Sequence, residues 1–237
     1  MKIEIWSDFV CPYCYIGKRR LELALYEFEY RDRVKIEFKS FELDPDSQAK
    51  PPNQSIHEYL ALKKGMPLED VKRMHELVGK QAAAIGLIYN FDTMQHTNTF
   101  DAHRLAKYAE KKNLGAKMTE KLLHAYFTDS ELISDHHILK RLAIEVGLDG
   151  AEVEELLATN RYANRVREDQ ELASEMGVGS VPFFVFNEKY AISGAQPKEI
   201  FKQILQKVWE EDQEQFELQS NPKTSYCTGE ECDLKNK

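Results

Sequence analysis

The sequence has few cysteines, no long apolar run and no excess of positive charge. Its four cysteines among 237 residues are too few for the dense disulfide framework of a small secreted domain. No run approaches the roughly 18 apolar residues of a membrane-spanning helix, so no membrane partner is expected. The 32 lysines and arginines are outnumbered by 40 acidic residues, and the net charge of −8 argues against nucleic-acid binding. The first residues also lack the pattern of a signal peptide, which predicts a cytoplasmic protein.

The composition fits one large folded domain, or one domain with a sizeable insertion. Hydrophobic residues make up 42% of the chain, enough for a core. Hydrophobic periodicity and turn signals divide the chain into three parts. The first is strand, helix, strand; the second is a series of helices; the third is two short strands and a helix. The expected strands are residues 1–6, 34–43, 181–186 and 190–193, and the expected last helix is residues 198–210.

This order predicts an α/β protein with a thioredoxin fold, in which a β-α-β half and a β-β-α half are separated by a large all-helical insertion. The thioredoxin-like domain is expected to comprise residues 1–50 and 166–210, and the insertion residues 51–165. Without the insertion, about 100 residues remain, a typical size for a small domain. Residues 211–237 are polar and charged, and we expect them to form a flexible tail.

The segment Cys11-Pro12-Tyr13-Cys14 lies where the first expected strand turns into a helix. Unpaired backbone N–H groups and the helix dipole favour an anion there, so Cys11 is expected to be a thiolate and the attacking nucleophile. Cys14, one turn further, can attack a mixed disulfide formed at Cys11. Pro12 suits the first helical turn because it has no N–H to leave unpaired. Tyr13 is expected to be exposed and, with Pro12, to contact the substrate.

The same C-x2-C spacing occurs in zinc sites, but such a site needs a second pair of ligands. The other cysteines, Cys227 and Cys232, lie far away in the tail, so we expect neither a metal nor a cofactor. Three roles are possible for the tail pair: an auxiliary redox pair that exchanges disulfides with Cys11 and Cys14, a zinc site, or a passive disulfide. A flexible tether of about 20 residues has a root-mean-square reach of about 25 Å, enough to approach the active site, which favours the redox role.

The charged and imidazole side chains are expected to be mostly solvated. Lys18 and Arg19 follow the second cysteine of the motif and are predicted on the exposed face of the first helix. His103 lies on an amphipathic helical pattern, where it either lines the substrate cleft or is a hydrogen-bonded structural residue. Four further histidines stand in polar contexts and are expected at the surface: His57, His75, His96 and His124.

Val181-Pro182 stands at the entry to an apolar strand. A proline cannot donate a hydrogen bond to a strand ladder, so it belongs at a strand's first position or edge. In thioredoxin folds the loop that faces the dithiol carries a cis-proline, and Pro182 is the candidate for it. The backbone of Val181 is then expected to pair with an extended substrate segment next to Cys11. The alternative is a trans proline that begins an edge strand.

With both parts of this site placed, the chain resembles the DsbA family of thioredoxin-fold proteins, and more closely its FrnE-like branch of dithiol-disulfide isomerases. The resemblance extends over most of the chain, and the C-x4-C tail resembles an extension of some FrnE-like members. Tyr13 and Ile5 stand where periplasmic members have a histidine and an acidic residue, so the resemblance implies a reductase, isomerase or relay rather than a strong oxidase. The motifs that carry it are Ser7 to Cys14, Phe41 to Pro45, Asn98 to Leu105 and Gly177 to Phe184.

The leading hypothesis is a thiol-disulfide oxidoreductase or isomerase that acts on protein disulfides through Cys11, Cys14 and a facing cis-Pro182. Its expected partners are protein thiols and disulfides, with a thioredoxin or a low-molecular-weight thiol as reductant. One alternative is a glutathione-dependent enzyme similar to kappa-class transferases and 2-hydroxychromene-2-carboxylate isomerases, which use a serine in place of the dithiol. The other is a non-catalytic adaptor or holdase that binds unfolded segments in the cleft.

Overall fold

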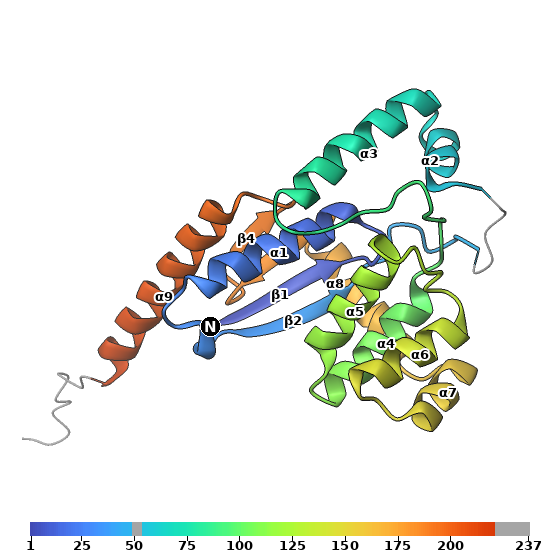
Figure 1. The fold of residues 1–237 in the computed structure, drawn as a ribbon. Coiled ribbons are helices and arrows are strands. Elements are labelled where there is room, and N and C mark those ends of the chain that lie inside the picture. The colour runs from blue at the N-terminus through green and yellow to red at the C-terminus, as the bar shows by residue number, and fades with distance from the viewer. Residues whose placement is uncertain (49–53, 221–237) are drawn as a thin grey trace, which may run out of the picture.

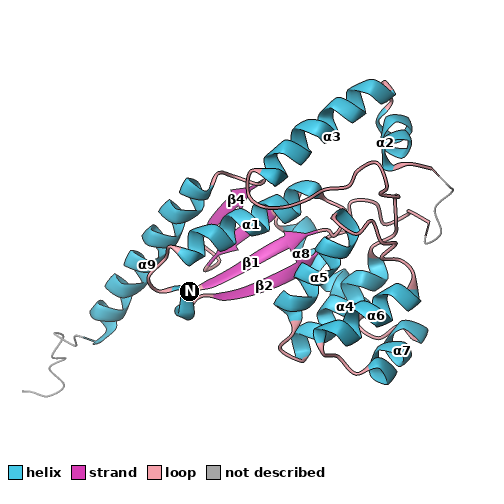
Figure 2. Cartoon of the chain, viewed as in Figure 1, coloured by secondary structure: helices cyan, strands magenta, loops and turns pink. Residues whose placement is uncertain are grey.

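The computed structural model describes residues 1–48 and 54–220, which form a mixed sheet surrounded by helices (Figures 1 and 2). The strands lie in the order β2-β1-β3-β4. β1 is parallel to β2 and antiparallel to β3, and β4 is antiparallel to β3. The strands are β1 (Lys2–Ser7), β2 (Lys35–Ser40), β3 (Phe183–Phe186) and β4 (Tyr190–Ser193).

Helices cover both faces of the sheet. One face packs on α1 and α9 through an apolar cluster that includes Ile5, Phe184 and Phe201. On the other face Trp6 packs against α8, where its indole donates a hydrogen bond to the Asp169 carbonyl at 2.9 Å. The helices are α1 (Pro12–Tyr26), α2 (Ile56–Lys64), α3 (Leu68–Ala83), α4 (Phe100–Lys111), α5 (Gly115–Phe127), α6 (His136–Val146), α7 (Gly150–Ala158), α8 (Ala163–Glu175) and α9 (Lys198–Ser220), with a 3₁₀ turn at Arg31–Arg33.

The helices between β2 and β3 build a second apolar core. Leu105, Leu122 and Leu142 lie in it, one each from α4, α5 and α6. Local signals start several of these helices: Ser55 and Glu58 form a capping box before α2, and Asp135 and Asp149 cap α6 and α7. Tyr15 and Ile16 of α1 belong to the same core. The helix that follows Cys11 is therefore held from both sides, by the sheet and by the helical part.

The predicted thioredoxin fold, with its β-α-β and β-β-α halves on either side of a helical stretch, is confirmed. One boundary is wrong: α9 continues through Ser220, so no tail begins at residue 211. Residues 211–220 are rich in glutamate and glutamine, which are good helix formers despite their polarity. Tyr190 and Asn187 also donate hydrogen bonds to Glu211 and Asp212, which tie this part of α9 to the sheet. The tail cysteines Cys227 and Cys232 lie outside the described residues.

Candidate active site

The dithiol lies at the start of α1, just beyond the end of β1. Cys11 is the N-cap residue, with extended backbone at φ −88° and ψ 111°, and Pro12 occupies the first helical position. The Cys14 N–H donates to the Cys11 carbonyl at 3.0 Å, and the Cys11 N–H donates to the Asp8 carbonyl at 3.2 Å. The chain therefore turns sharply from strand to helix, and this turn brings both thiols to one end of the sheet.

Both thiols are free and largely covered, with 4% of Cys11 and 2% of Cys14 exposed. Burial raises the pKa of Cys14 well above its usual value, and the hydrogen bond and charge of Cys11 raise it further. Hydrogen bonds from the Ser7 side chain and the Asp8 backbone act in the opposite direction but do not outweigh burial. Cys14 is therefore held as a protonated thiol. Tyr13, between the two cysteines, is 41% exposed, as the sequence predicts.

The predicted partner of the dithiol is in place. The Val181–Pro182 peptide bond is cis, and the Val181 carbonyl lies 3.5 Å from Cys11 Sγ. Gly17 of α1 lies directly against this loop, because a Cβ at Gly17 would be only 3.0 Å from Pro182 Cγ and from Phe184 Cζ. The absence of a side chain at Gly17 thus allows the helix that carries the dithiol to approach the loop that faces it.

His103 lies in the interior, where it is hydrogen-bonded to Asp8. Its Nε2 is 3.3 Å from Asp8 Oδ1, and its ring lies 4.7 Å from that of Phe9. Asp8 Oδ2 accepts a hydrogen bond from the Leu43 N–H at 2.8 Å, so both carboxylate oxygens are used. His103 is 3% exposed, which fits the structural alternative left open by the sequence. The sequence analysis did not identify Asp8 as the partner of His103, although Asp8 lies within the motif Ser7 to Cys14.

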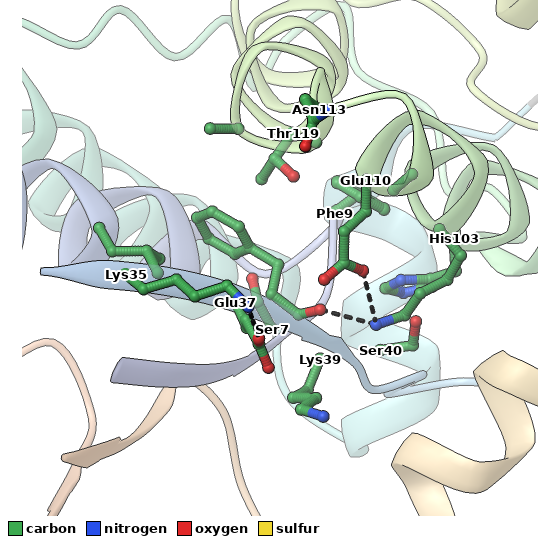
Figure 3. Close-up of a pocket in the computed structure, with 16 residues that line it drawn as sticks. Ser7, Phe9, Lys35, Glu37, Lys39, Ser40, His103, Glu110, Asn113 and Thr119 are labelled. Atoms are coloured by element: carbon green, nitrogen blue, oxygen red, sulfur yellow. Dashed lines mark hydrogen bonds and ion pairs between the residues drawn. The ribbon is translucent and has the colours of Figure 1, made fainter. Parts of the chain in front are cut away.

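A pocket of about 320 Å³ lies between the free edge of β2 and helices α4 and α5 (Figure 3). Its lining includes Ser7, Phe9 and His103. Ser7 also hydrogen-bonds to Cys14. The pocket therefore reaches the residues next to the resolving thiol. Nothing in the sequence predicts this pocket, because its walls come from strands and helices about 70 residues apart in the chain.

An aromatic residue of the α3–α4 loop also reaches the dithiol. The Tyr89 hydroxyl donates a hydrogen bond to the Pro12 carbonyl at 2.7 Å. Its ring stacks on Phe127 with centroids 4.5 Å apart and lies 6.1 Å from the ring of Tyr15. Tyr89 lies 77 residues from Pro12 in the chain, so the local sequence offers no reason to connect it with the dithiol.

The expectation that Lys18 is solvated is wrong. It is 5% exposed, and its ammonium group bonds to Glu22 of its own helix and to Glu120 of α5. Glu120 also accepts hydrogen bonds from Tyr15 at 2.6 Å and from Arg19 at 3.1 Å. Burial opposes the ionisation of Glu120, but the charge and hydrogen bond of Lys18 outweigh it and lower its pKa. This network joins the dithiol helix to the helical part of the molecule.

Three histidines expected at the surface are buried: His57, His75 and His96. The Nδ1 atoms of His57 and His75 lie 2.8 Å apart, and the His75 ring stacks on Phe91 at 4.2 Å. The packing of α2 against α3, together with the loop that follows α3, covers them, which a local polar context does not reveal. In the described part of the chain no three His, Cys, Asp or Glu side chains are grouped so that they could hold a metal ion.

The fold and the cysteine pair define a class: thioredoxin-fold proteins with a dithiol at the start of the first helix. The chain belongs to the family of the DSBA-like thioredoxin domain, whose model matches residues 2–206. It is 40% identical to a probable DsbA oxidoreductase from Streptomyces coelicolor, whose crystal structure superposes with a TM-score of 0.85 and 89% of this chain and 91% of that chain covered.

Two further proteins are similar. Protein YwbO of Bacillus subtilis strain 168 is 30% identical over 207 residues, which cover 86% of this chain and 94% of YwbO. A 2-hydroxychromene-2-carboxylate isomerase structure is 14% identical, with a TM-score of 0.68 and coverage of 90% of this chain and 98% of that chain. At this identity the second similarity shows the fold alone. Among the residues described here, no helix is both long and apolar enough to cross a membrane.

Proposed function

We propose that this protein is a thiol-disulfide oxidoreductase or isomerase that acts on protein disulfides, with Cys11 as the nucleophile and Cys14 as the resolving thiol. The observation that carries the proposal is the unequal environment of two thiols within one helical turn. Cys11 caps a helix N-terminus, whose unpaired N–H groups favour a thiolate. Cys14 is buried and its pKa is raised, so it remains a protonated thiol until the resolving step.

The proposed reaction has two steps of thiol-disulfide exchange. The Cys11 thiolate attacks one sulfur of the substrate disulfide, and the other substrate sulfur leaves as a thiolate and takes up a proton. Cys14 then loses its proton and attacks the Cys11 sulfur, which releases the second substrate thiol and closes the Cys11–Cys14 disulfide. The substrate gains two electrons, and a thioredoxin or a low-molecular-weight thiol restores the dithiol. We place this cycle in the cytoplasm, where dithiols are usually catalytic rather than structural.

The proposed substrate site is the surface formed by the dithiol and the loop that faces it. The Val181 carbonyl lies 3.5 Å from Cys11 Sγ, so an extended segment that hydrogen-bonds to the Val181 backbone would bring its own sulfur close to Cys11. Tyr13 is exposed beside Cys11 and, with Pro12, supplies the apolar contact. His103 is not part of this proposed surface, because it is buried against Asp8.

Insulin reduction with glutathione or thioredoxin as electron donor tests the proposal. Cys11→Ser should abolish turnover, and Cys14→Ser should accumulate a mixed disulfide at Cys11. Limiting iodoacetamide at neutral pH should label Cys11 before Cys14. The matched control is the double variant Cys227→Ser, Cys232→Ser, which removes two thiols outside the described site. Earlier labelling of Cys14, or glutathione-dependent isomerisation without insulin reduction, contradicts the proposal.

A further inference from the structure

Both cysteines are nearly covered. Among the described residues, one hydrogen bond joins the four residues Cys11 to Cys14 to the helical part of the molecule, and it comes from Tyr89. The Tyr89 hydroxyl donates to the Pro12 carbonyl at 2.7 Å. Pro12 is the first residue of α1, so its carbonyl also accepts a backbone hydrogen bond from the next turn of the helix. A carbonyl oxygen has two lone pairs and can accept both.

The hydroxyl is held in place by its surroundings. The Tyr89 ring stacks on Phe127 at 4.5 Å and meets Phe91 edge-on at 5.6 Å. The loop itself is fastened to the end of α5, because the Asn90 N–H donates to the Phe127 carbonyl at 2.8 Å and the Thr128 hydroxyl donates to the Ile88 carbonyl at 2.8 Å. Burial raises the pKa of Tyr89, and the nearby Cys11 raises it further, so the phenol remains a donor at every working pH.

The planarity of the peptide bond connects this hydrogen bond with Cys11. The Pro12 carbonyl and the Tyr13 N–H belong to one rigid trans peptide unit and point in opposite directions. The carbonyl points along α1, so the N–H points back toward the N-terminus of the helix, where Cys11 is the cap. Pro12 has no N–H, and that of Cys14 donates to the Cys11 carbonyl at 3.0 Å. In this structure the Cys11 side chain makes no capping hydrogen bond, and its thiol lies 3.5 Å from the Val181 carbonyl. The Tyr13 N–H is therefore free to donate once Cys11 becomes a thiolate.

We infer that Tyr89 is a positioning residue for Cys11: by hydrogen-bonding the Pro12 carbonyl, it orients and polarises the first peptide group of α1 so that the Tyr13 N–H stabilises the Cys11 thiolate. Hydrogen bonds in a chain strengthen one another, by about 10–30% per bond. A more stable thiolate favours the reduced form, so Tyr89 makes the dithiol a stronger oxidant. The inference rests on the proposed function, because it concerns the reactivity of the same cysteine pair.

Tyr89→Phe tests the inference, since it removes the hydroxyl and keeps the ring contacts. In redox buffers of reduced and oxidised glutathione, the variant equilibrium should shift about threefold toward the Cys11–Cys14 disulfide, which is about 14 mV for a two-electron couple. The pH midpoint of the thiolate absorbance at 240 nm should rise by about half a unit, the same threefold change. Repeating the pH titration in the Cys14→Ser background assigns the shift to Cys11.

Tyr126→Phe is the matched control. Tyr126 is also a buried tyrosine whose hydroxyl donates to a backbone carbonyl, that of Gln95, at 3.1 Å. Both variants should lose similar thermal stability, but Tyr126→Phe should leave the glutathione equilibrium and the thiolate titration unchanged. A purely structural role for Tyr89 predicts a lower melting temperature with no redox shift, and that result overturns the inference. A wild-type protein that forms no reversible Cys11–Cys14 disulfide overturns the proposed function instead.

Discussion

The two thiols occupy different positions at the start of α1: Cys11 is the N-cap residue, and Cys14 lies inside the first turn. Cys14 is buried one turn into α1, and burial, followed by the hydrogen bond with Cys11, raises its pKa. Its attack on a mixed disulfide requires the thiolate, which is scarce at pH values below that raised pKa. The resolving step should therefore accelerate about tenfold for each pH unit between pH 6 and 8.

Single-turnover release of a labelled thiol from the Cys11 mixed disulfide measures this step. Cys14→Ser is the control and should show no release at any pH. A release rate that does not change between pH 6 and 8 would show that Cys14 is already ionised, contrary to its buried environment.

At the same scale, His75 should make the fold sensitive to acid. Burial, with a smaller contribution from His57, lowers the pKa of His75 to about 4. The unfolded chain binds a proton near pH 6.5 and the folded protein near pH 4, so the neutral ring stabilises the fold above pH 6.5 and this stability is lost as pH falls toward 4. Between pH 7 and pH 5 the free energy of unfolding should fall by about 1–2 kcal/mol because of His75.

Denaturant unfolding of His75→Gln at pH 7 and pH 5 tests this expectation, because the variant should lose less stability over that range than the wild type does. His124→Gln is the control, since the His124 side chain is 47% exposed. Equal pH dependence in His75→Gln and the wild type would contradict the low pKa.

At the scale of elements, a buried ion pair bonds to the free edge of β2. Lys107 of α4 donates to the Phe38 carbonyl at 2.7 Å, and Asp169 of α8 accepts the Ser40 N–H at 2.8 Å. Lys107 Nζ lies 2.5 Å from Asp169 Oδ2, and each of these two side chains is only 9% exposed. Two backbone groups that an edge strand would leave open to another chain, the Phe38 carbonyl and the Ser40 N–H, are thus satisfied within the molecule.

Asp169→Asn should leave the buried Lys107 with only the more distant Glu110 carboxylate, at 3.7 Å, and lower the free energy of unfolding by about 3 kcal/mol, the usual cost of removing one partner of a buried pair. Urea unfolding measures the change. Glu27→Gln breaks the exposed pairs with Lys198 and Lys202 and should have a much smaller effect. Equal losses in the two variants would mean that the edge pair is as well solvated as the surface pairs.

At the scale of the whole molecule, the long α9 changes what the tail cysteines can reach. Asp212 of α9 contacts Asn187, which bonds to Lys2 at the end of β1 opposite the dithiol. β1 spans about 20 Å. The last eight residues of α9 lead about 12 Å further from the sheet (Figure 1). The tether to Cys227 therefore begins roughly 30 Å from Cys11.

The seven residues from Ser220 to Cys227 span at most about 25 Å when fully extended. The Cα atoms of a disulfide lie about 5.5 Å apart, so Cys227 reaches Cys11 of its own chain only with a fully extended tether, which costs conformational entropy. A disulfide between Cys11 and Cys227 should therefore form mainly between two chains. Trapping in Cys14→Ser should yield this crosslink in a covalent dimer, with a rate that rises with protein concentration. The same crosslink in a monomer, independent of concentration, would show that α9 unwinds or that the tail takes another path.

Local sequence signals were sufficient for the dithiol and the topology. Pro12 and the two cysteines mark a helix start, and the order of apolar runs gives the two halves of the thioredoxin fold. These features depend on residues close together in the chain, where backbone propensity and hydrophobic periodicity act. The position of Pro182 was predictable because the fold, once recognised, fixes which loop faces the dithiol.

Tertiary packing decided the rest. Tyr89 hydrogen-bonds to Pro12, 77 residues away in the chain, and Lys18 bonds to Glu120, 102 residues away. A polar side chain on a helix has the same local sequence whether its face is solvated or covered by a later helix, so the burial of Lys18 and His75 could not be read from the chain. The sequence by itself determined which sulfurs are available and where a helix begins. Only the folded structure decided which distant groups set their reactivity, because burial and hydrogen bonding depend on what packs against them.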